Sequence, residues 1–242
     1  MAENSSGYGK LYVIPNMLGE TEPLEVLPLS IKRTIEQVDD YIVESEKAAR
    51  KFIKKINSGK SQPSLRIFLL NKYTDAAELQ HYLEPCLNGK SMGLLSDAGC
   101  PGVADPGAVI VNLAHQKNIT VVPLVGPSSI LLAMMASGMN GQSFAFNGYL
   151  SIDRNDRKKE IKKFEKISGD TGQTQIFIET PYRNDKLFSD FLSILNNATL
   201  LCIACDLTLP TEYIKTMTVA EWKTENPDLH KRPSIFIIQK PE

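Results

Sequence analysis

The chain has 242 residues, enough to bury the core of one large domain or of two modest ones. Its 42% hydrophobic and 23% charged content is ordinary for a globular protein and excludes a disordered or fibrous chain. The formal net charge of −1 excludes a general electrostatic attraction to nucleic acid, so such contacts would need local basic clusters. No apolar run approaches the roughly 20 residues of a membrane span, and no secretory signal is visible, so we expect a cytoplasmic protein without a membrane partner.

Strand-like and helix-like segments alternate along the first half of the chain. We expect strands at residues 11–15, 41–43, 65–70, 92–95 and 119–124. We expect helices at 28–38, 45–56, 75–87 and 106–117, with Ser45 as the N-cap of the second. This alternation predicts an α/β fold in which a mostly parallel sheet carries helices on both faces.

The second half has a different pattern. A helix rich in small residues is expected at 128–137, ended by Gly138, and residues 151–168 are polar and charged. Strands are expected at 175–178, 200–204, 213–216 and 234–238, with a short helical segment at 219–223 between the last two. The close spacing predicts a mixed sheet. We therefore expect two α/β domains, at residues 1–125 and 126–242.

Two loops rich in glycine and proline follow consecutive strand-like runs. The first is SDAGCPGVADPG at residues 96–107, and the second is VGPSS at 125–129. Glycine lets the backbone approach a ligand closely, and proline restricts the loop to one shape. Because parallel sheets bind ligands beyond the carboxyl ends of their strands, the pair predicts a shared binding edge rather than two unrelated surface turns.

The cysteines and histidines do not indicate a metal site or a disulfide framework. Cys202 and Cys205 form a C-x-x-C, but the run LLCIACDL reads as a buried strand, on which these two side chains point to opposite faces. The three histidines are scattered, so we expect no bound metal.

The two loops and four further segments, in this order, strongly resemble the tetrapyrrole-methylase-like methyltransferases. The further segments are LYVIP at 11–15, IFIETPYR at 176–183, LTLPTEYI at 207–214 and KRPSIFII at 231–238. The resemblance is closest to the branch that methylates a cytidine ribose 2′-oxygen in small-subunit ribosomal RNA. It implies ribosomal RNA or the small ribosomal subunit as partner, and commonly a homodimer.

The resemblance also implies S-adenosylmethionine as methyl donor, bound in a cleft between the two domains. The helix that begins near Ser128 would then direct its N-terminus at the cofactor, or else serve only as a capped core helix. The expected cofactor contacts are Pro15, Ser96, Asp97, Ala98, Gly99, Cys100, Pro101, Gly126, Pro127, Ser128, Ser129, Ala204 and Leu207.

Methyl transfer requires few catalytic groups, because the sulfonium already activates the methyl group and the protein mainly aligns the reactants. Transfer to a ribose hydroxyl needs a proton acceptor, for which Asp97, Asp105 and Glu179 are candidates. Glu179 and Arg183 follow a strand-like run and are expected to open a helix, either facing the cleft or as a solvated first turn.

Several segments depart from the ribosomal branch, and these departures concern the methyl acceptor. The branch's Thr-Pro-Ile-Gly-Asn-Leu is replaced at residues 14–20, its Glu-Asp-Thr-Arg at 44–47, and its loop threonine by Cys100. Two alternatives therefore stay open: C-methylation of a corrin or porphyrin precursor, and a non-catalytic protein that binds S-adenosylmethionine.

Two basic clusters suit contacts with RNA phosphates, although such helix faces are more often plain solvated surface. The first comprises Lys47, Arg50, Lys51, Lys54 and Lys55, and the second Arg154, Arg157, Lys158, Lys159, Lys162, Lys163 and Lys166.

Overall fold

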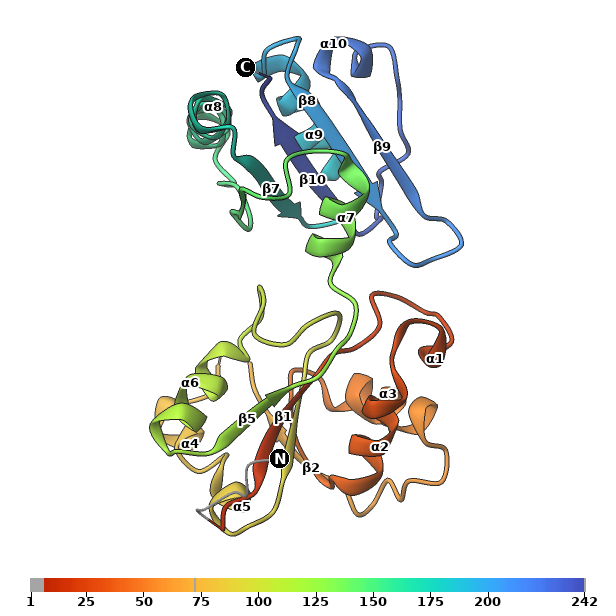
Figure 1. Cartoon of the computed structure of the whole chain (residues 1–242), viewed down its shortest axis with the longest axis vertical. Coiled ribbons are helices and arrows are strands. Elements are labelled where there is room, and N and C mark those ends of the chain that lie inside the picture. The colour runs from red at the N-terminus through yellow and green to blue at the C-terminus, as the bar shows by residue number, and fades with distance from the viewer. Residues whose placement is uncertain (1–6, 72, 242) are drawn as a thin grey trace. The chain divides into compact units, whose positions relative to one another are not determined.

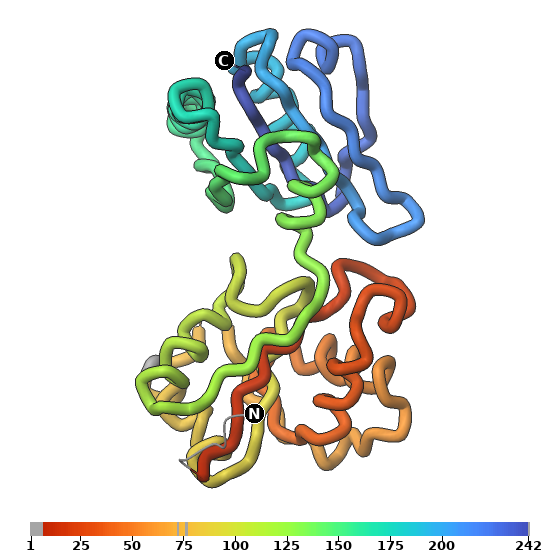
Figure 2. Tube along the Cα trace, in the orientation of Figure 1, coloured from red at the N-terminus to blue at the C-terminus, as the bar shows by residue number. Residues whose placement is uncertain are grey.

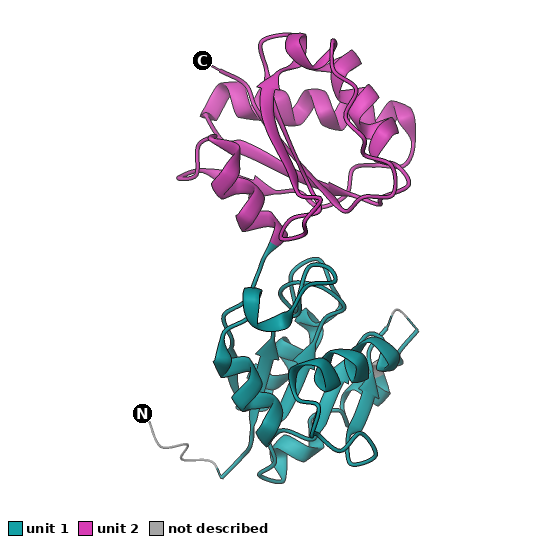
Figure 3. Cartoon of the chain, turned by 90° about the vertical axis from the view of Figure 1, so that its right-hand side faces the viewer, with its two compact units in different colours: residues 1–128 teal, residues 129–242 magenta. Residues whose placement is uncertain are grey.

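A computed structural model describes residues 7–71 and 73–241. The chain forms two compact units, residues 1–128 and 129–242 (Figure 3). It passes from the first unit to the second once, as the trace in Figure 2 shows. None of the described helices is both long and apolar enough to cross a membrane.

The first unit is built on a parallel sheet, as the alternating pattern predicts (Figure 1). The strand order is β3-β2-β4-β1-β5, and every adjacent pair is parallel. The strands are β1 (Lys10–Ile14), β2 (Asp40–Val43), β3 (Arg66–Leu69), β4 (Met92–Leu95) and β5 (Thr120–Pro123). Ile14 and Val43 both lie opposite Leu95, so the loops that follow β1, β2 and β4 leave the sheet together.

Helices cover both faces of this sheet, because the strands direct apolar side chains to both faces. One core joins Ile14 and Tyr41 to α2 and α3, and the other joins Leu11 and Leu94 to α6. The helices are α1 (Pro23–Val26), α2 (Leu29–Gln37), α3 (Glu46–Ile56), α4 (Ala76–Leu79), α5 (Glu84–Leu87) and α6 (Ala108–Gln116). Ser45 caps α3 as predicted, its Oγ accepting from the Ala48 N–H at 3.3 Å.

The prediction of a single helix at residues 75–87 is wrong, because the segment forms two separate helices, α4 and α5. The physical reason is Pro85, which lacks an N–H and whose ring clashes with the preceding turn of a helix. Pro85 is therefore accommodated only in the first turn, and a new helix begins just before it.

The second unit contains the mixed sheet that the sequence predicts, in the order β6-β7-β10-β8-β9. β6 and β7 are parallel, and the other adjacent pairs are antiparallel. The strands are β6 (Phe144–Phe146), β7 (Thr174–Glu179), β8 (Leu200–Cys205), β9 (Tyr213–Thr218) and β10 (Ser234–Gln239). The helices are α7 (Ser129–Ser137), α8 (Arg154–Thr171), α9 (Asn184–Ile194) and α10 (Val219–Trp222). Strand β6 was not expected, because three residues are too few to show a period.

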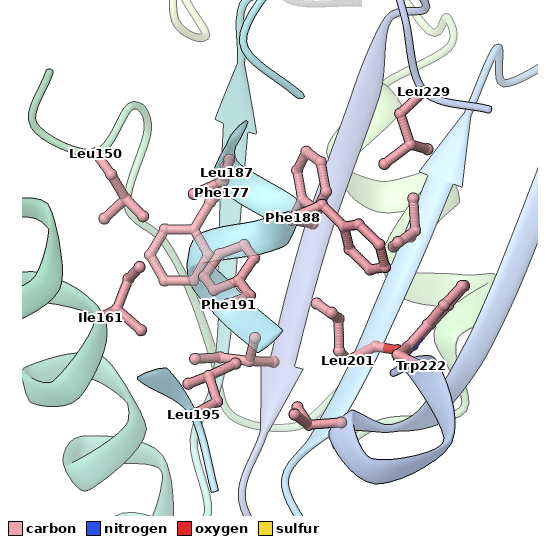
Figure 4. Close-up of a cluster of buried hydrophobic side chains, with 14 of the residues drawn as sticks. Leu150, Ile161, Phe177, Leu187, Phe188, Phe191, Leu195, Leu201, Trp222 and Leu229 are labelled. Atoms are coloured by element: carbon pink, nitrogen blue, oxygen red, sulfur yellow. The ribbon is translucent and has the colours of Figure 1, made fainter. Parts of the chain in front are cut away.

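An aromatic core fills the face of this sheet under α8, α9 and α10 (Figure 4). Phe177, Phe191 and Trp222 are fully buried there, and the Trp222 indole N–H donates to the Leu201 carbonyl at 2.8 Å. Helix α7 packs against the strands of the same sheet. Cys205 belongs to the aromatic core whereas the equally buried Cys202 does not, as expected of positions i and i+3 on a strand.

Candidate functional site

The loops after β1 and β4 are joined by a short antiparallel bridge. The Asn16 N–H donates to the Gly99 carbonyl at 2.9 Å, and the Gly99 N–H returns the bond to Asn16 at 3.2 Å. The Asn16 side-chain amide also donates to the carbonyls of Ser96 and Asp97, at 3.1 Å each. Asn16, which sequence reasoning did not select, thus fixes the first glycine- and proline-rich loop from a distance of about 80 residues in the chain.

Within that loop, buried and exposed residues have different tasks. The Ser96 hydroxyl donates to the carbonyls of Ala98 and Gly99, at 3.0 and 3.1 Å. Ser96, Gly99 and Pro101 are buried, whereas Asp97 and Ala98 are exposed. Hydrogen bonds to its backbone therefore hold the loop in a conformation that exposes Asp97 and Ala98.

The second glycine- and proline-rich loop, residues 125–129, packs directly against the loops after β1 and β4. A Cβ at Gly126 would lie 2.2 Å from Pro15 Cβ, so any larger residue would displace the backbone. The half-buried Cys100 donates its thiol to the Pro127 carbonyl at 3.4 Å. Pro127 is buried, and Ser128 and Ser129 are half-buried. The loops that follow β1, β2, β4 and β5 lie at the same end of the first sheet. We call this end the first-sheet edge.

A hollow of about 270 Å³ opens at the first-sheet edge. One wall is the chain after β1, another is α3 with Lys51 and Lys55, and Asp97 and Ala98 close it. Lys51 forms an ion pair with Glu20, and Lys55 donates to the Thr21 carbonyl at 2.5 Å. The hollow is near the lower end of the volumes typical of small-molecule sites, which start at roughly 300 Å³.

Three carboxylates gather at the first-sheet edge. Glu44 follows β2 directly, and its Oε1 accepts from the Asp97 N–H at 3.3 Å. Burial raises the pKa of Glu44; the hydrogen bond from the Asp97 N–H opposes this rise, and the charges of Asp105 and Asp97 add to it. Glu44 is a site residue that the sequence prediction missed. Its position directly after a buried strand of the parallel sheet could have indicated it, because ligands bind at the carboxyl ends of such strands.

Asp97 and Asp105 differ in what their carboxylates touch. Asp105 Oδ1 accepts from the N–H groups of Gly102 and Gly107, at 2.6 and 2.7 Å, so it braces the loop. Burial raises the pKa of both carboxyls, and in Asp105 the two N–H bonds oppose that rise. Among the described residues, no hydrogen bond or ion pair engages the Asp97 carboxylate, which is therefore available to a ligand.

Glu179 and Arg183 form a bonded pair in the second unit. Glu179 is the last residue of β7 and is buried, and its Oε1 accepts from the Thr180 N–H at 2.6 Å and from Arg183 Nε at 2.9 Å. The expectation that they open a helix is wrong for Glu179, because α9 begins at Asn184 with Arg183 as its N-cap residue. Strand pairing with β10 continues through Glu179 and delays the helix.

The same end of the second sheet carries another charge pair. Ser234 lies opposite both Glu179 and Cys205, and Asp206 follows directly. The Asp206 carboxylate accepts from Arg232 Nε and from the Thr211 hydroxyl, at 2.8 Å each. We call this end, residues 179–184, 204–211 and 228–234, the second-sheet edge. Ala204 and Leu207, the expected cofactor contacts here, are 0% and 6% exposed, so in this structure they offer almost no surface to a ligand.

The basic cluster on α8 is smaller than its composition suggests. Arg157 is 4% exposed, donates to Asp190 Oδ2 at 2.7 Å and to two carbonyls, and therefore cannot belong to a phosphate-binding face. The amphipathic helix turns this one cation toward the interior, where Asp190 of α9 compensates its charge. Lys159 is paired with Asp156 at 2.9 Å, whereas Lys158 and Lys162 are exposed.

Among the residues that the structure describes, no three His, Cys, Asp or Glu side chains are arranged to hold a metal ion. The four cysteines are free thiols.

Comparison with known proteins gives consistent matches along the chain. Proteins named ribosomal RNA small subunit methyltransferase I are 29% identical in Vibrio cholerae, over 94% of this chain and 76% of the relative, and 29% identical in Bacillus subtilis, over 91% and 72%. The solved methyltransferase CobJ is 14% identical with a TM-score of 0.64, covering 96% of this chain and 94% of that one. Cobalt precorrin-4 methyltransferase CbiF, 14% identical, covers 99% and 97% with a TM-score of 0.61, so both show a shared fold. The family model of the tetrapyrrole (corrin/porphyrin) methylases matches residues 24–223, and the chain belongs to that family.

Proposed function

We propose that this protein transfers the methyl group of S-adenosylmethionine to a ribose 2′-oxygen of small-subunit ribosomal RNA. The observation that carries the proposal is the similarity, over more than nine tenths of the chain, to proteins named for methylation of that RNA. Membership of a family of methylases supports the reaction class. The solved structures support only the fold, so they do not favour a corrin or porphyrin acceptor.

The first-sheet edge fits S-adenosylmethionine in its backbone geometry. Gly99 has φ of +66° and Gly126 lies against Pro15, so both glycines let the loops of this edge pack closely enough to form one surface. The open Asp97 carboxylate can accept hydrogen bonds from the ammonium or hydroxyl groups of the cofactor. Once bound, the cofactor supplies an activated methyl group, and the protein's task is to align it and to exclude water.

The sequence left the proton acceptor open among Asp97, Asp105 and Glu179, and the contacts of these three favour Asp97. Glu179 is held by a guanidinium and Asp105 by two backbone N–H groups, so both carboxylates already serve the protein's own structure, whereas no described residue bonds to the Asp97 carboxylate. Asp97 is exposed at the hollow, and its raised pKa brings it nearer the range suited to general-base catalysis. We assign the proton transfer to Asp97, with Glu44 and Asp105 holding its loop.

The exposed lysines of α8 are proposed as the RNA-facing surface of the second unit. Lys158, Lys162 and Lys163 project from the helix without an acidic partner among the described residues, in contrast to Lys159 and Lys166. The homodimer implied by the resemblance and the cytoplasmic location expected from the sequence stay predictions.

The test compares small-subunit ribosomal RNA from cells with and without the protein. Digestion to nucleosides and mass spectrometry should show one 2′-O-methylated nucleoside missing in the deficient cells. The purified protein, incubated with S-adenosylmethionine and the unmodified subunit, should restore it. A methyl group found on a base, or transfer only to a corrin or porphyrin precursor, would contradict the proposal.

A further inference from the structure

An exposed aromatic ring stands at the second-sheet edge. Tyr182 lies in the turn between β7 and α9, which the Arg183 N–H closes by donating to the Thr180 carbonyl at 2.8 Å. The side chain is 74% exposed, whereas the aromatic residues of this unit's core are buried. A single exposed ring is common, so its meaning depends on what surrounds it.

Lys231 lies beside this ring, held there by a second loop. Its Nζ is 5.8 Å from the centre of the Tyr182 ring, and its backbone N–H donates to the Pro181 carbonyl at 3.1 Å. Asn184 is completely buried and donates to the carbonyls of Leu229 and Arg232, at 3.1 and 2.6 Å. The two loops are therefore bonded to each other on both sides of the ring and the ammonium group.

The backbone of Lys231 is in the left-handed region, with φ of +58°. This conformation is unfavourable for a lysine, and folded proteins retain it mainly where the surrounding structure or a function requires it. Lys231 itself is exposed to solvent, and its ammonium group is directed at the exposed Tyr182 ring.

Among the described residues around Tyr182, two acids are paired with arginines and two lysines have no acidic partner. Glu179 is paired with Arg183, Asp206 with Arg232, and Asp185 with His230 at 3.5 Å. No ion pair of the described residues engages Lys231 or the exposed Lys186. An aromatic face beside uncompensated ammonium groups matches the two parts of an unpaired nucleotide, its base and its phosphate.

We propose that Tyr182 and Lys231 form a stacking platform for an unpaired nucleotide of the RNA substrate. The base stacks on the ring face that Lys231 leaves open, and the Lys231 ammonium contacts a backbone phosphate. This inference rests on the proposed function and adds to it a specific RNA contact, made by a residue that takes no part in methyl transfer itself. Stacking accepts any base, so the platform contributes affinity and strand position rather than sequence recognition.

The experiment measures the affinity of the full-length protein for single-stranded oligouridylate, and for a ribose–phosphate chain of equal length without bases. Tyr182→Ala should weaken oligouridylate binding by about 5- to 150-fold, as expected for loss of one stacked base. Tyr182→Phe, which keeps the ring, should bind within about twofold of the parent. The baseless chain should bind equally to the parent and to Tyr182→Ala. Tyr149→Ala is the matched control, because Tyr149 is another exposed tyrosine of the same unit, 55% exposed.

Four results would overturn the platform. Unchanged oligouridylate binding by Tyr182→Ala, with ribosomal RNA methylation intact, would reject it and leave the proposed function standing. If Tyr182→Leu binds oligouridylate as tightly as Tyr182→Phe does, the side chain makes a general apolar contact rather than a stacking contact. A defect seen only with assembled ribosomal subunits, and not with naked RNA, would assign the ring to a protein surface. If the parent neither binds RNA nor methylates it, the platform and the proposed function are both wrong.

Discussion

The first-sheet edge and the second-sheet edge are held together by different forces. At the first, Asn16 and Ser96 bond to loop carbonyls, glycine leaves space for close packing, and the Asp105 and Glu44 carboxylates accept from backbone N–H groups rather than from arginines. At the second, the carboxylates of Glu179 and Asp206 are occupied by arginines. The first edge therefore leaves a carboxylate, Asp97, free for chemistry, whereas the second uses its carboxylates internally and leaves cations free for a polyanion.

The sharpest way to break this comparison is to neutralise one carboxylate at each edge. Asp97→Asn should slow methyl transfer about 10²- to 10⁴-fold in single-turnover measurements, the usual contribution of a positioned general base. Glu179→Gln should keep the rate of the transfer step, because that carboxylate serves Arg183. Equal losses in the two variants would remove the distinction between the edges.

The same pair of variants should differ in pH dependence. Burial raises the pKa of Asp97, and the base acts only when deprotonated, so the parent rate should rise with pH through a pKa above the ordinary value of an aspartate. Asp97→Asn should remove this rise, while Glu179→Gln keeps it. A parent profile that is flat across this range would argue against Asp97 as the base.

The next effect concerns charge pairing inside the second unit. Arg157→Ala should lower the free energy of unfolding by about 3–5 kcal/mol, because it removes the close partner of the buried Asp190 carboxylate and leaves only the exposed Arg154, 4.0 Å away. Lys158→Ala, one residue along on the exposed face, should change it by less than about 0.5 kcal/mol. Chemical denaturation of both variants measures the difference, and a small effect of Arg157→Ala would show that Asp190 reaches water or another partner.

Two glycines provide a matched test of the first-sheet edge. A Cβ at Gly126 would lie 2.2 Å from Pro15 Cβ, and a Cβ at Gly9 would lie 2.2 Å from the Lys90 carbonyl oxygen. Each alanine variant should lose about 1–3 kcal/mol of stability through overpacking. Only Gly126→Ala should also weaken S-adenosylmethionine binding in calorimetry. Equal cofactor affinity in both variants would place the cofactor elsewhere.

The smallest effect is expected from the basic face of α8. Replacing Lys158, Lys162 and Lys163 with Glu should lower the salt dependence of RNA binding by about 0.7 to 0.9 logarithmic units per lost phosphate contact. The cofactor affinity should not change. The matched variant Lys159→Glu should have less effect, since Lys159 is already paired with Asp156. Identical salt slopes for parent and triple variant would identify these lysines as solvated surface.

The sequence alone determined the features that depend on short segments. Strand and helix periods predicted the parallel sheet, the mixed sheet and the Ser45 cap, and the spacing of Cys202 and Cys205 predicted their opposite faces. The order of the glycine- and proline-rich loops indicated the family, which the family model confirms. Such features are set by local sterics and by the burial pattern of each element, both of which are legible within a few residues.

Only the tertiary structure decided which residues meet. Asn16 reaches the loop after β4, Glu44 joins Asp97, and Arg157 turns inward to Asp190, all across long stretches of chain. Pairing of non-adjacent strands and the rotation of each helix about its axis fix these contacts. The charge pattern of one segment cannot specify which cation its fold will bury, because that depends on a carboxylate supplied by another element.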